Sequence, residues 1–90
     1  MQFGDWLNLG RIKDTWYLIC LTENKQFKDE LEQLLGRNAA IRKITDYLFQ
    51  IDTTMNRALF EKNVKSLIGK EDSATVIYPT SKGLKHKEVQ

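Results

Sequence analysis

Two ten-residue stretches of this chain follow one template, and they constrain its fold more than any other feature. Phe27–Gly36 (FKDELEQLLG) and Phe60–Gly69 (FEKNVKSLIG) each begin with phenylalanine, repeat aliphatic residues at helical spacing and end on glycine, a common helix terminator. A strand-like run precedes each copy, and an alternating run follows it. Strand–helix–strand is therefore encoded twice. We predict an α+β protein with the ferredoxin-like βαββαβ sandwich, a four-stranded antiparallel sheet with two helices on one face.

The strand before each helix is rich in aromatic and aliphatic residues. Thr15–Leu21 (TWYLICL) is the most apolar run of the chain, with apolar residues at both odd and even positions. Such a run is typical of a central strand that is buried on both faces. Asp46–Asp52 (DYLFQID) alternates, which places Tyr47, Phe49 and Ile51 on one face.

The two remaining strands follow the helical stretches. Ala39–Thr45 is predicted as an edge strand because charged residues interrupt it, and Ser73–Pro79 ends at the only proline, which removes a backbone donor. We expect a first helix over about residues 25–35, capped by Asn24, and a second over about residues 55–68. The candidate caps of the second helix are Asp52, Thr53 and Thr54.

Ninety residues are enough for one domain with a single modest core. We divide the chain into an apolar N-terminal segment (1–14), the ferredoxin-like domain (15–79) and a basic flexible tail (80–90). The N-terminal segment either covers the sheet face without helices or docks on another chain, and both alternatives stay open. Its candidate protein-interface residues are Phe3, Trp6, Leu7, Leu9 and Ile12.

Residues that commonly carry chemistry are few and scattered. Cys20 lies in the central strand and His86 in the tail, so no nucleophile has a histidine beside it in the packed part of the chain. Strand ends carry carboxylates (Asp14, Glu23, Asp46, Asp52 and Asp72), but no fixed spacing links them. The sequence assigns no catalytic residue, metal or cofactor, and favours a non-enzymatic role.

Basic residues offer a candidate nucleic-acid surface. The net charge of +2 is modest, but several cations flank the expected second strand and others lie in the tail. These candidates are Arg37, Arg42, Lys43, Arg57, Lys82 and Lys85. Tyr17, Tyr47 and Phe49 could stack bases on the sheet, although core or interface packing is the commoner use of such aromatic residues.

Three stretches resemble the small ferredoxin-like family of CRISPR-associated adaptation nucleases and their stand-alone relatives. They are Trp16–Leu21 (WYLICL), Asp46–Thr53 (DYLFQIDT) and Glu71–Pro79 (EDSATVIYP). The resemblance implies a homodimer, often completed by exchange of segments beyond the fourth strand, that acts on or bridges nucleic acid. An aspartate that ends the first strand binds a divalent metal in active members. This chain has Thr22 and Glu23 there, which implies weak or no nuclease activity.

Two functional hypotheses follow. The first is a small non-catalytic protein that binds a protein partner through its sheet face and N-terminal segment, as a regulator or inhibitor of the kind that mobile elements carry. The second is a nucleic-acid-binding homodimer. One cysteine, no apolar run near 20 residues and no signal-peptide pattern lead us to expect a cytoplasmic protein outside the membrane.

Overall fold

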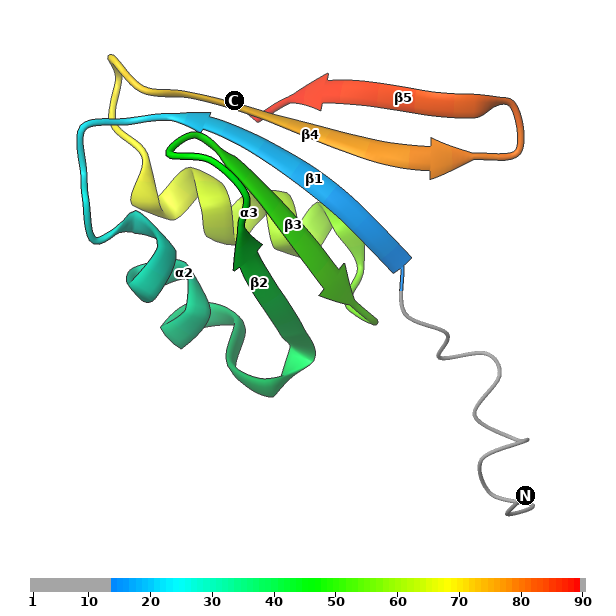
Figure 1. Cartoon of the computed structure of the whole chain (residues 1–90), viewed down its shortest axis with the longest axis horizontal. Helices are drawn as coiled ribbons and strands as arrows, with labels where there is room; N and C mark the ends of the chain where they lie inside the picture. Colours follow the sequence, from blue (N-terminus) through cyan, green and yellow to red (C-terminus); the bar gives the residue numbers. More distant parts are fainter. Residues whose placement is uncertain (1–13, 90) are drawn as a thin grey trace.

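Five antiparallel strands and two helices make up residues 14–89, the part of the chain that the computed structural model describes (Figure 1). In chain order the elements are β1 (Asp14–Leu21), α2 (Phe27–Leu35), a short 3-10 turn η2 (Gly36–Asn38), β2 (Ala39–Lys43), β3 (Leu48–Thr53), α3 (Arg57–Leu67), β4 (Ser73–Thr80) and β5 (Gly83–Glu88). Both helices lie on one face of the sheet. The α+β prediction is confirmed.

Strand β1 lies in the middle of the sheet because it pairs with a neighbour on each side. It runs antiparallel to β3 and to β4, so that Leu18 lies opposite Phe49 on one side and Val76 on the other. The full strand order is β2-β3-β1-β4-β5. The first four strands interleave as two strand–helix–strand units would place them. The predicted four-stranded sheet is nevertheless wrong in its strand number, because β5 pairs with the free edge of β4.

The side chains of β1 alternate between two different environments. Trp16, Leu18 and Cys20 are buried beneath the helices, whereas Ile19 and Leu21 on the opposite face are 37% and 50% exposed. The prediction of a strand buried on both faces is therefore wrong for the described residues. Central pairing explains the apolar run, and the described chain supplies no layer over the second face, which we call the open face.

Each helix begins slightly later than its sequence pattern suggests. The Oδ1 atom of Asn24 accepts a hydrogen bond from the N–H of Gln26 at 3.0 Å, so a turn precedes α2, which starts at Phe27. Helix α3 is capped by Asn56, whose Oδ1 accepts the N–H of Ala58 at 2.8 Å.

The predicted caps of the second helix are used elsewhere. Thr53 is fully buried, and its hydroxyl donates to the carbonyl of Asn38 at 2.6 Å. The carboxylate of Asp52 accepts the hydroxyl of Thr15 at 2.7 Å across the sheet. The Thr53 hydroxyl also accepts the N–H of Met55 at 2.9 Å, so it orders the turn before α3, while Asn56 caps the helix itself.

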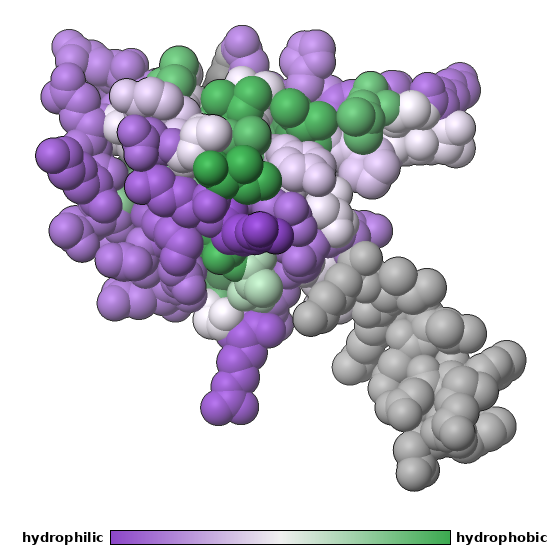
Figure 2. Space-filling model, viewed as in Figure 1, coloured by the Kyte–Doolittle hydropathy of each residue, from purple (hydrophilic) through white to green (hydrophobic). Residues whose placement is uncertain are grey.

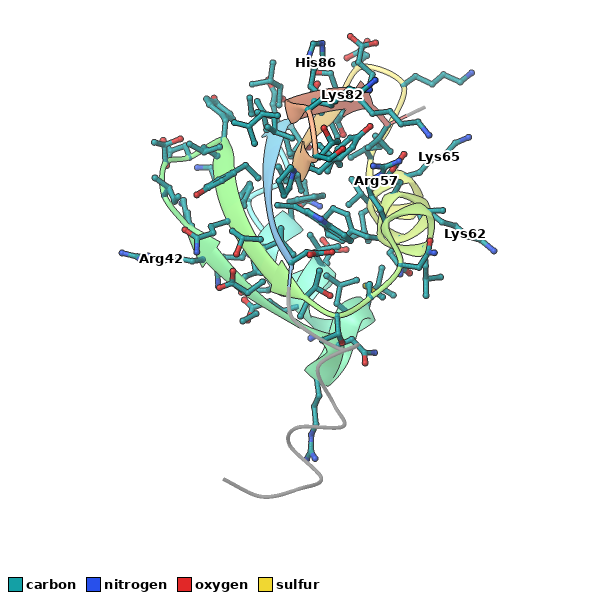
Figure 3. The ribbon with its side chains drawn as sticks, turned by 90° about the vertical axis from the view of Figure 1, so that its right-hand side faces the viewer. Arg42, Arg57, Lys62, Lys65, Lys82 and His86 are labelled. Carbon is teal, nitrogen blue, oxygen red and sulfur yellow. The ribbon has the colours of Figure 1, made fainter. Side chains whose placement is uncertain are left out.

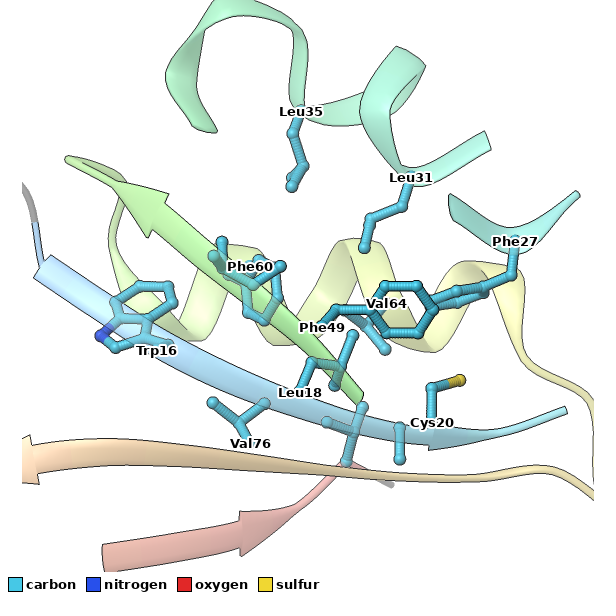
Figure 4. Close-up of a cluster of buried hydrophobic side chains, with 13 residues drawn as sticks. Trp16, Leu18, Cys20, Phe27, Leu31, Leu35, Phe49, Phe60, Val64 and Val76 are labelled. Atoms are coloured by element: carbon cyan, nitrogen blue, oxygen red, sulfur yellow. The ribbon is translucent and has the colours of Figure 1, made fainter. Parts of the chain in front are cut away.

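The core forms between the helices and the covered face of the sheet (Figure 4). The rings of Trp16 and Phe60 lie 5.3 Å apart, and those of Phe27 and Phe49 lie 5.8 Å apart. Leu31, Leu35 and Val64 fill the space between these pairs. The helical spacing of apolar residues in Phe27–Gly36 also predicts that Leu34 is buried, and this is wrong because Leu34 is 48% exposed.

The C-terminal residues form a strand where the sequence predicts a flexible tail. β5 (Gly83–Glu88) pairs with β4 along its length, and the N–H of Val89 donates to the carbonyl of Ala74 at 2.8 Å. Gly83 makes the turn with a φ of 109°, a conformation that side chains disfavour. The side chains of β5 are exposed, so backbone pairing and the buried Val89 hold the strand, and neither leaves an apolar pattern.

Replacing Phe60 by alanine should remove the aromatic contact that joins α3 to β1. Phe60 is fully buried, so we expect Phe60→Ala to lower the free energy of unfolding by about 3–5 kcal/mol. Urea denaturation followed by circular dichroism measures this loss. Leu59→Ala is the matched control on the same helix, because Leu59 is 50% exposed and its truncation should cost less than about 1 kcal/mol. Equal losses would contradict the assignment of Phe60 to the core.

Candidate functional site

An apolar band crosses the open face of the sheet. The strand register places Ile19 opposite Leu48, Tyr17 opposite Ile77, and Pro79 opposite Leu84 on this face. We call Tyr17, Ile19, Leu48, Ile77 and Leu84 the apolar band. In the view of Figure 2, hydrophobic residues gather across the centre of the sheet and continue toward the β4–β5 hairpin.

Polar residues border the apolar band on both sides. Arg42 and Gln50 face the same side on β2 and β3, while His86 and Glu88 lie on β5 at the other edge. Leu84 is 71% exposed and Ile19 is 37% exposed, so the band meets solvent in the described part of the chain. An apolar patch of this kind with a polar rim commonly marks an interaction surface. The alternation of side chains in Ser73–Pro79 already places Ile77 on the opposite face from Ala74, Val76 and Tyr78. No comparable sequence pattern predicts the position of Leu84.

The predicted protein-interface residues cannot be located on this surface. Phe3, Trp6, Leu7, Leu9 and Ile12 lie outside the described residues, which begin at position 14.

A second surface is a basic groove between α3 and β5. Ala58, Glu61, Lys62, Lys65, Lys87, Glu88 and Val89 line it. Glu61 is largely buried and forms ion pairs with the Nε atom of Arg57 at 3.1 Å and with the Nζ atom of Lys87 at 3.3 Å. Lys62 and Lys65 form no ion pair among residues 14–89, and both side chains are exposed and extend outward from α3 at the border of the groove (Figure 3).

The predicted nucleic-acid candidates divide between two edges of the sheet. Arg57, Lys82 and Lys85 lie on the side of α3 and β5, whereas Arg42 lies at the β2 edge (Figure 3). Arg37 and Lys43 join Arg42 there. The structure therefore does not bring all six together within one chain.

Some of these cations have partners of their own. The guanidinium of Arg57 lies over the ring of Tyr78, 3.7 Å from its centroid. Lys43 pairs with Asp46 at 3.4 Å. Lys62 and Lys65 are missing from the predicted set. Their i, i+3 spacing on a helix was the available signal, but its meaning depends on β5, which the sequence did not predict.

A shallow hollow at the end of β1 gathers carboxylates without forming a metal site. Leu21, Thr22, Glu23, Tyr47, Glu71 and Asp72 line it. The Oδ2 atom of Asp72 accepts the N–H of Gly69 at 2.9 Å, so that carboxylate orders a turn. Within residues 14–89, no group of three His, Cys, Asp or Glu side chains is arranged to hold a metal ion. In the same range, no helix is long and apolar enough to cross a membrane.

Comparison with known proteins adds no assignment to these surfaces. No family model, no curated protein and no solved structure matches the chain. The functional argument therefore depends on the open face and the α3–β5 groove.

Cys20 should be unreactive in the folded protein. It is 1% exposed, and burial, together with the smaller effect of the negative charge of Asp72, raises the pKa of its thiol to about 11. The thiolate, which is the reactive form, is therefore scarce at pH 8. We expect a colorimetric disulfide reagent to leave the native protein unmodified at pH 8 and to label one thiol per chain in urea. Rapid labelling without denaturant would show that the covered side of β1 opens readily.

Proposed function

We propose that this protein is a small, non-catalytic binding domain that holds a protein partner on its open face. The apolar band is the observation that supports this function, because it occupies the centre of the sheet and has no cover among the described residues. By occupying a surface of the partner, such binding regulates or inhibits it and needs no catalytic group. The interleaved order of β1 to β4 supports a ferredoxin-like arrangement extended by β5.

Substitutions within the apolar band should weaken partner binding without unfolding the domain. We expect Ile19→Ser with Ile77→Ser to weaken the complex about 30-fold, which corresponds to about 2 kcal/mol of lost apolar contact. The matched control is Leu34→Ser with Leu59→Ser, since these residues are also exposed but lie on the helices. Quantitative affinity capture with the wild type and both variants, followed by titration of the recovered protein, measures the effect.

Circular dichroism first establishes that both variants are folded. The proposal requires a partner that the wild type and the helix control retain and that the open-face variant loses. A partner bound equally by all three proteins would refute binding through the apolar band. Sedimentation of the purified protein decides whether that partner is a second copy of this chain.

A second function, binding of nucleic acid by a homodimer related to the CRISPR-associated adaptation nucleases, has support from the α3–β5 groove. Lys62, Lys65 and Lys87 line one concave surface, and Arg57 and Lys85 lie near it. Cations along a groove can follow a phosphate backbone without reading its sequence. Thr22 and Glu23 at the end of β1 support binding with weak or no metal-dependent cleavage.

Charge reversal at each edge of the sheet distinguishes the two basic regions. If the groove binds nucleic acid, Lys62→Glu with Lys65→Glu should abolish binding of short labelled RNA or DNA, whereas Arg42→Glu with Lys43→Glu should not. The slope of log affinity against log salt should be about −0.9 per phosphate contacted on duplex DNA. Fluorescence anisotropy across a salt series, with and without magnesium, provides the measurement. Flat curves at low salt would exclude this second function.

A further inference from the structure

Strand β5 forms a free edge of the sheet within residues 14–89. It is the last strand in the order β2-β3-β1-β4-β5, and among the described residues only β4 pairs with it (Figure 1). It has six residues, against five in β2 at the other edge. A free edge presents backbone donors and acceptors with which an extended segment of another protein can pair.

The register with β4 determines which backbone groups of β5 face this edge. Val89 continues the strand, and its N–H donates to the carbonyl of Ala74 at 2.8 Å. Residues along an antiparallel pair alternate between positions that hydrogen-bond to the neighbouring strand and positions that do not. Lys85 has the same phase as Val89 and turns its N–H and C=O groups toward β4. Leu84 and His86 therefore turn theirs to the outer edge.

The side chains of β5 differ between the two faces of the sheet. Leu84 lies on the open face, where it ends the apolar band and is 71% exposed. Lys85 lies on the covered face, opposite Tyr78, and forms no ion pair among residues 14–89. Lys87 on the same face pairs with Glu61. An added strand would therefore place apolar side chains beside Leu84 and acidic side chains beside Lys85.

The β2 edge has a different distribution of charge. Arg42 lies on the open face of β2, whereas Lys43 on its other face is already paired with Asp46 at 3.4 Å. An acidic strand at this edge would place its carboxylates on the open face, where they would not continue the apolar band. β5 is therefore the edge at which an alternating strand fits both faces.

We infer that β5 binds an extended segment of another protein as an additional antiparallel strand in which acidic and apolar residues alternate. Antiparallel pairing is expected because the whole sheet is antiparallel. Main-chain hydrogen bonds to Leu84 and His86 hold the segment, and its acidic residues pair with Lys85. The segment belongs to the partner that the proposed function places on the open face, and the inference rests on that function in this respect only.

A short labelled peptide of alternating glutamate and valine is the probe, and its control has lysine in place of glutamate. We expect fluorescence anisotropy to show that the acidic peptide binds, more weakly as salt increases, and that the basic peptide does not. Methylation of the valine backbone nitrogens should weaken binding at least tenfold, because these N–H groups face Leu84 and His86. Methylation of the glutamate nitrogens, whose N–H groups point away from β5, should change it less than about twofold.

Proline at position 86 removes an outward donor and leaves the pairing with β4 intact. Edge strands tolerate proline where its missing N–H would face solvent, and circular dichroism checks that the variant is folded. We expect His86→Pro to weaken binding of the acidic peptide about tenfold, whereas His86→Ala keeps the N–H and should stay within about twofold of the wild type. Lys85→Glu should weaken it about fivefold. Lys25→Glu, the same charge change in the exposed turn before α2, should not.

Hydrogen exchange locates the added strand directly. On saturation with the acidic peptide, the backbone N–H groups of Leu84 and His86 should exchange more slowly in two-dimensional NMR spectra. Ile41 on the β2 edge is the control, because its position in the register turns its N–H outward as well. Its exchange should not change.

The inference is overturned if the acidic peptide does not bind or if methylation of its valines leaves binding intact. It is also overturned if Lys62→Glu with Lys65→Glu removes binding while His86→Pro does not, because the charge of the groove then holds the peptide. Slower exchange at the β5 edge that develops with protein concentration, without peptide, would assign the edge to a second copy instead. Each of these results leaves the proposed function standing, since that function is tested by partner capture with the Ile19 and Ile77 variants.

Discussion

The pairing of β1 with a strand on each side determines the rest of this structure. Because β3 and β4 both use β1 as their neighbour, the register at Leu18 fixes which side chains of three strands face the helices. A shift by one residue would move Trp16 and Cys20 to the opposite face. The aromatic contact between Trp16 and Phe60 then orients α3 across the sheet, and Phe27 on Phe49 does the same for α2.

This arrangement gives the sheet two different faces, and the difference carries the functional argument. The two helices cover one side of the sheet, and their buried apolar residues pack against that side. Apolar residues on the other side therefore depend on something other than α2 and α3. A protein partner bound to the open face, as proposed, would bury them.

The parts of the structure that could be predicted are those that leave a periodic apolar signal. The central position of β1, the two helices and the end of α2 at Gly36 follow from such signals in Thr15–Leu21 and in the repeated template, whereas α3 ends at Leu67 with Ile68 as its C-cap, before the predicted Gly69. Helix starts could not be placed as well, because the candidate caps Asp52 and Thr53 form hydrogen bonds with Thr15 and with the carbonyl of Asn38, which are distant in the sequence, and Asn56 caps α3 in their place.

The candidate surfaces were harder to predict than the core. β5 has exposed side chains and depends on backbone pairing, on Val89 and on the ion pair between Lys87 and Glu61, none of which forms a pattern along the chain. The α3–β5 groove could not be predicted from the sequence, because β5 forms one of its walls. Without β5, Lys62 and Lys65 are ordinary surface lysines on one helix. Leu84 likewise joins the apolar band only through its position opposite Pro79.

The outer edge of β5 has a consequence for how copies of this protein meet. An unpaired strand edge presents backbone donors and acceptors that can accept a strand from another molecule and so begin an ordered aggregate. Lys85 and Lys87 lie on this edge strand, and Lys82 lies in the turn before it. Arg42 and Lys43 occupy the opposite edge on β2. Both ends of the sheet therefore carry positive charge, and electrostatic repulsion opposes the edge-to-edge polymerisation that an uncharged sheet of this shape would invite.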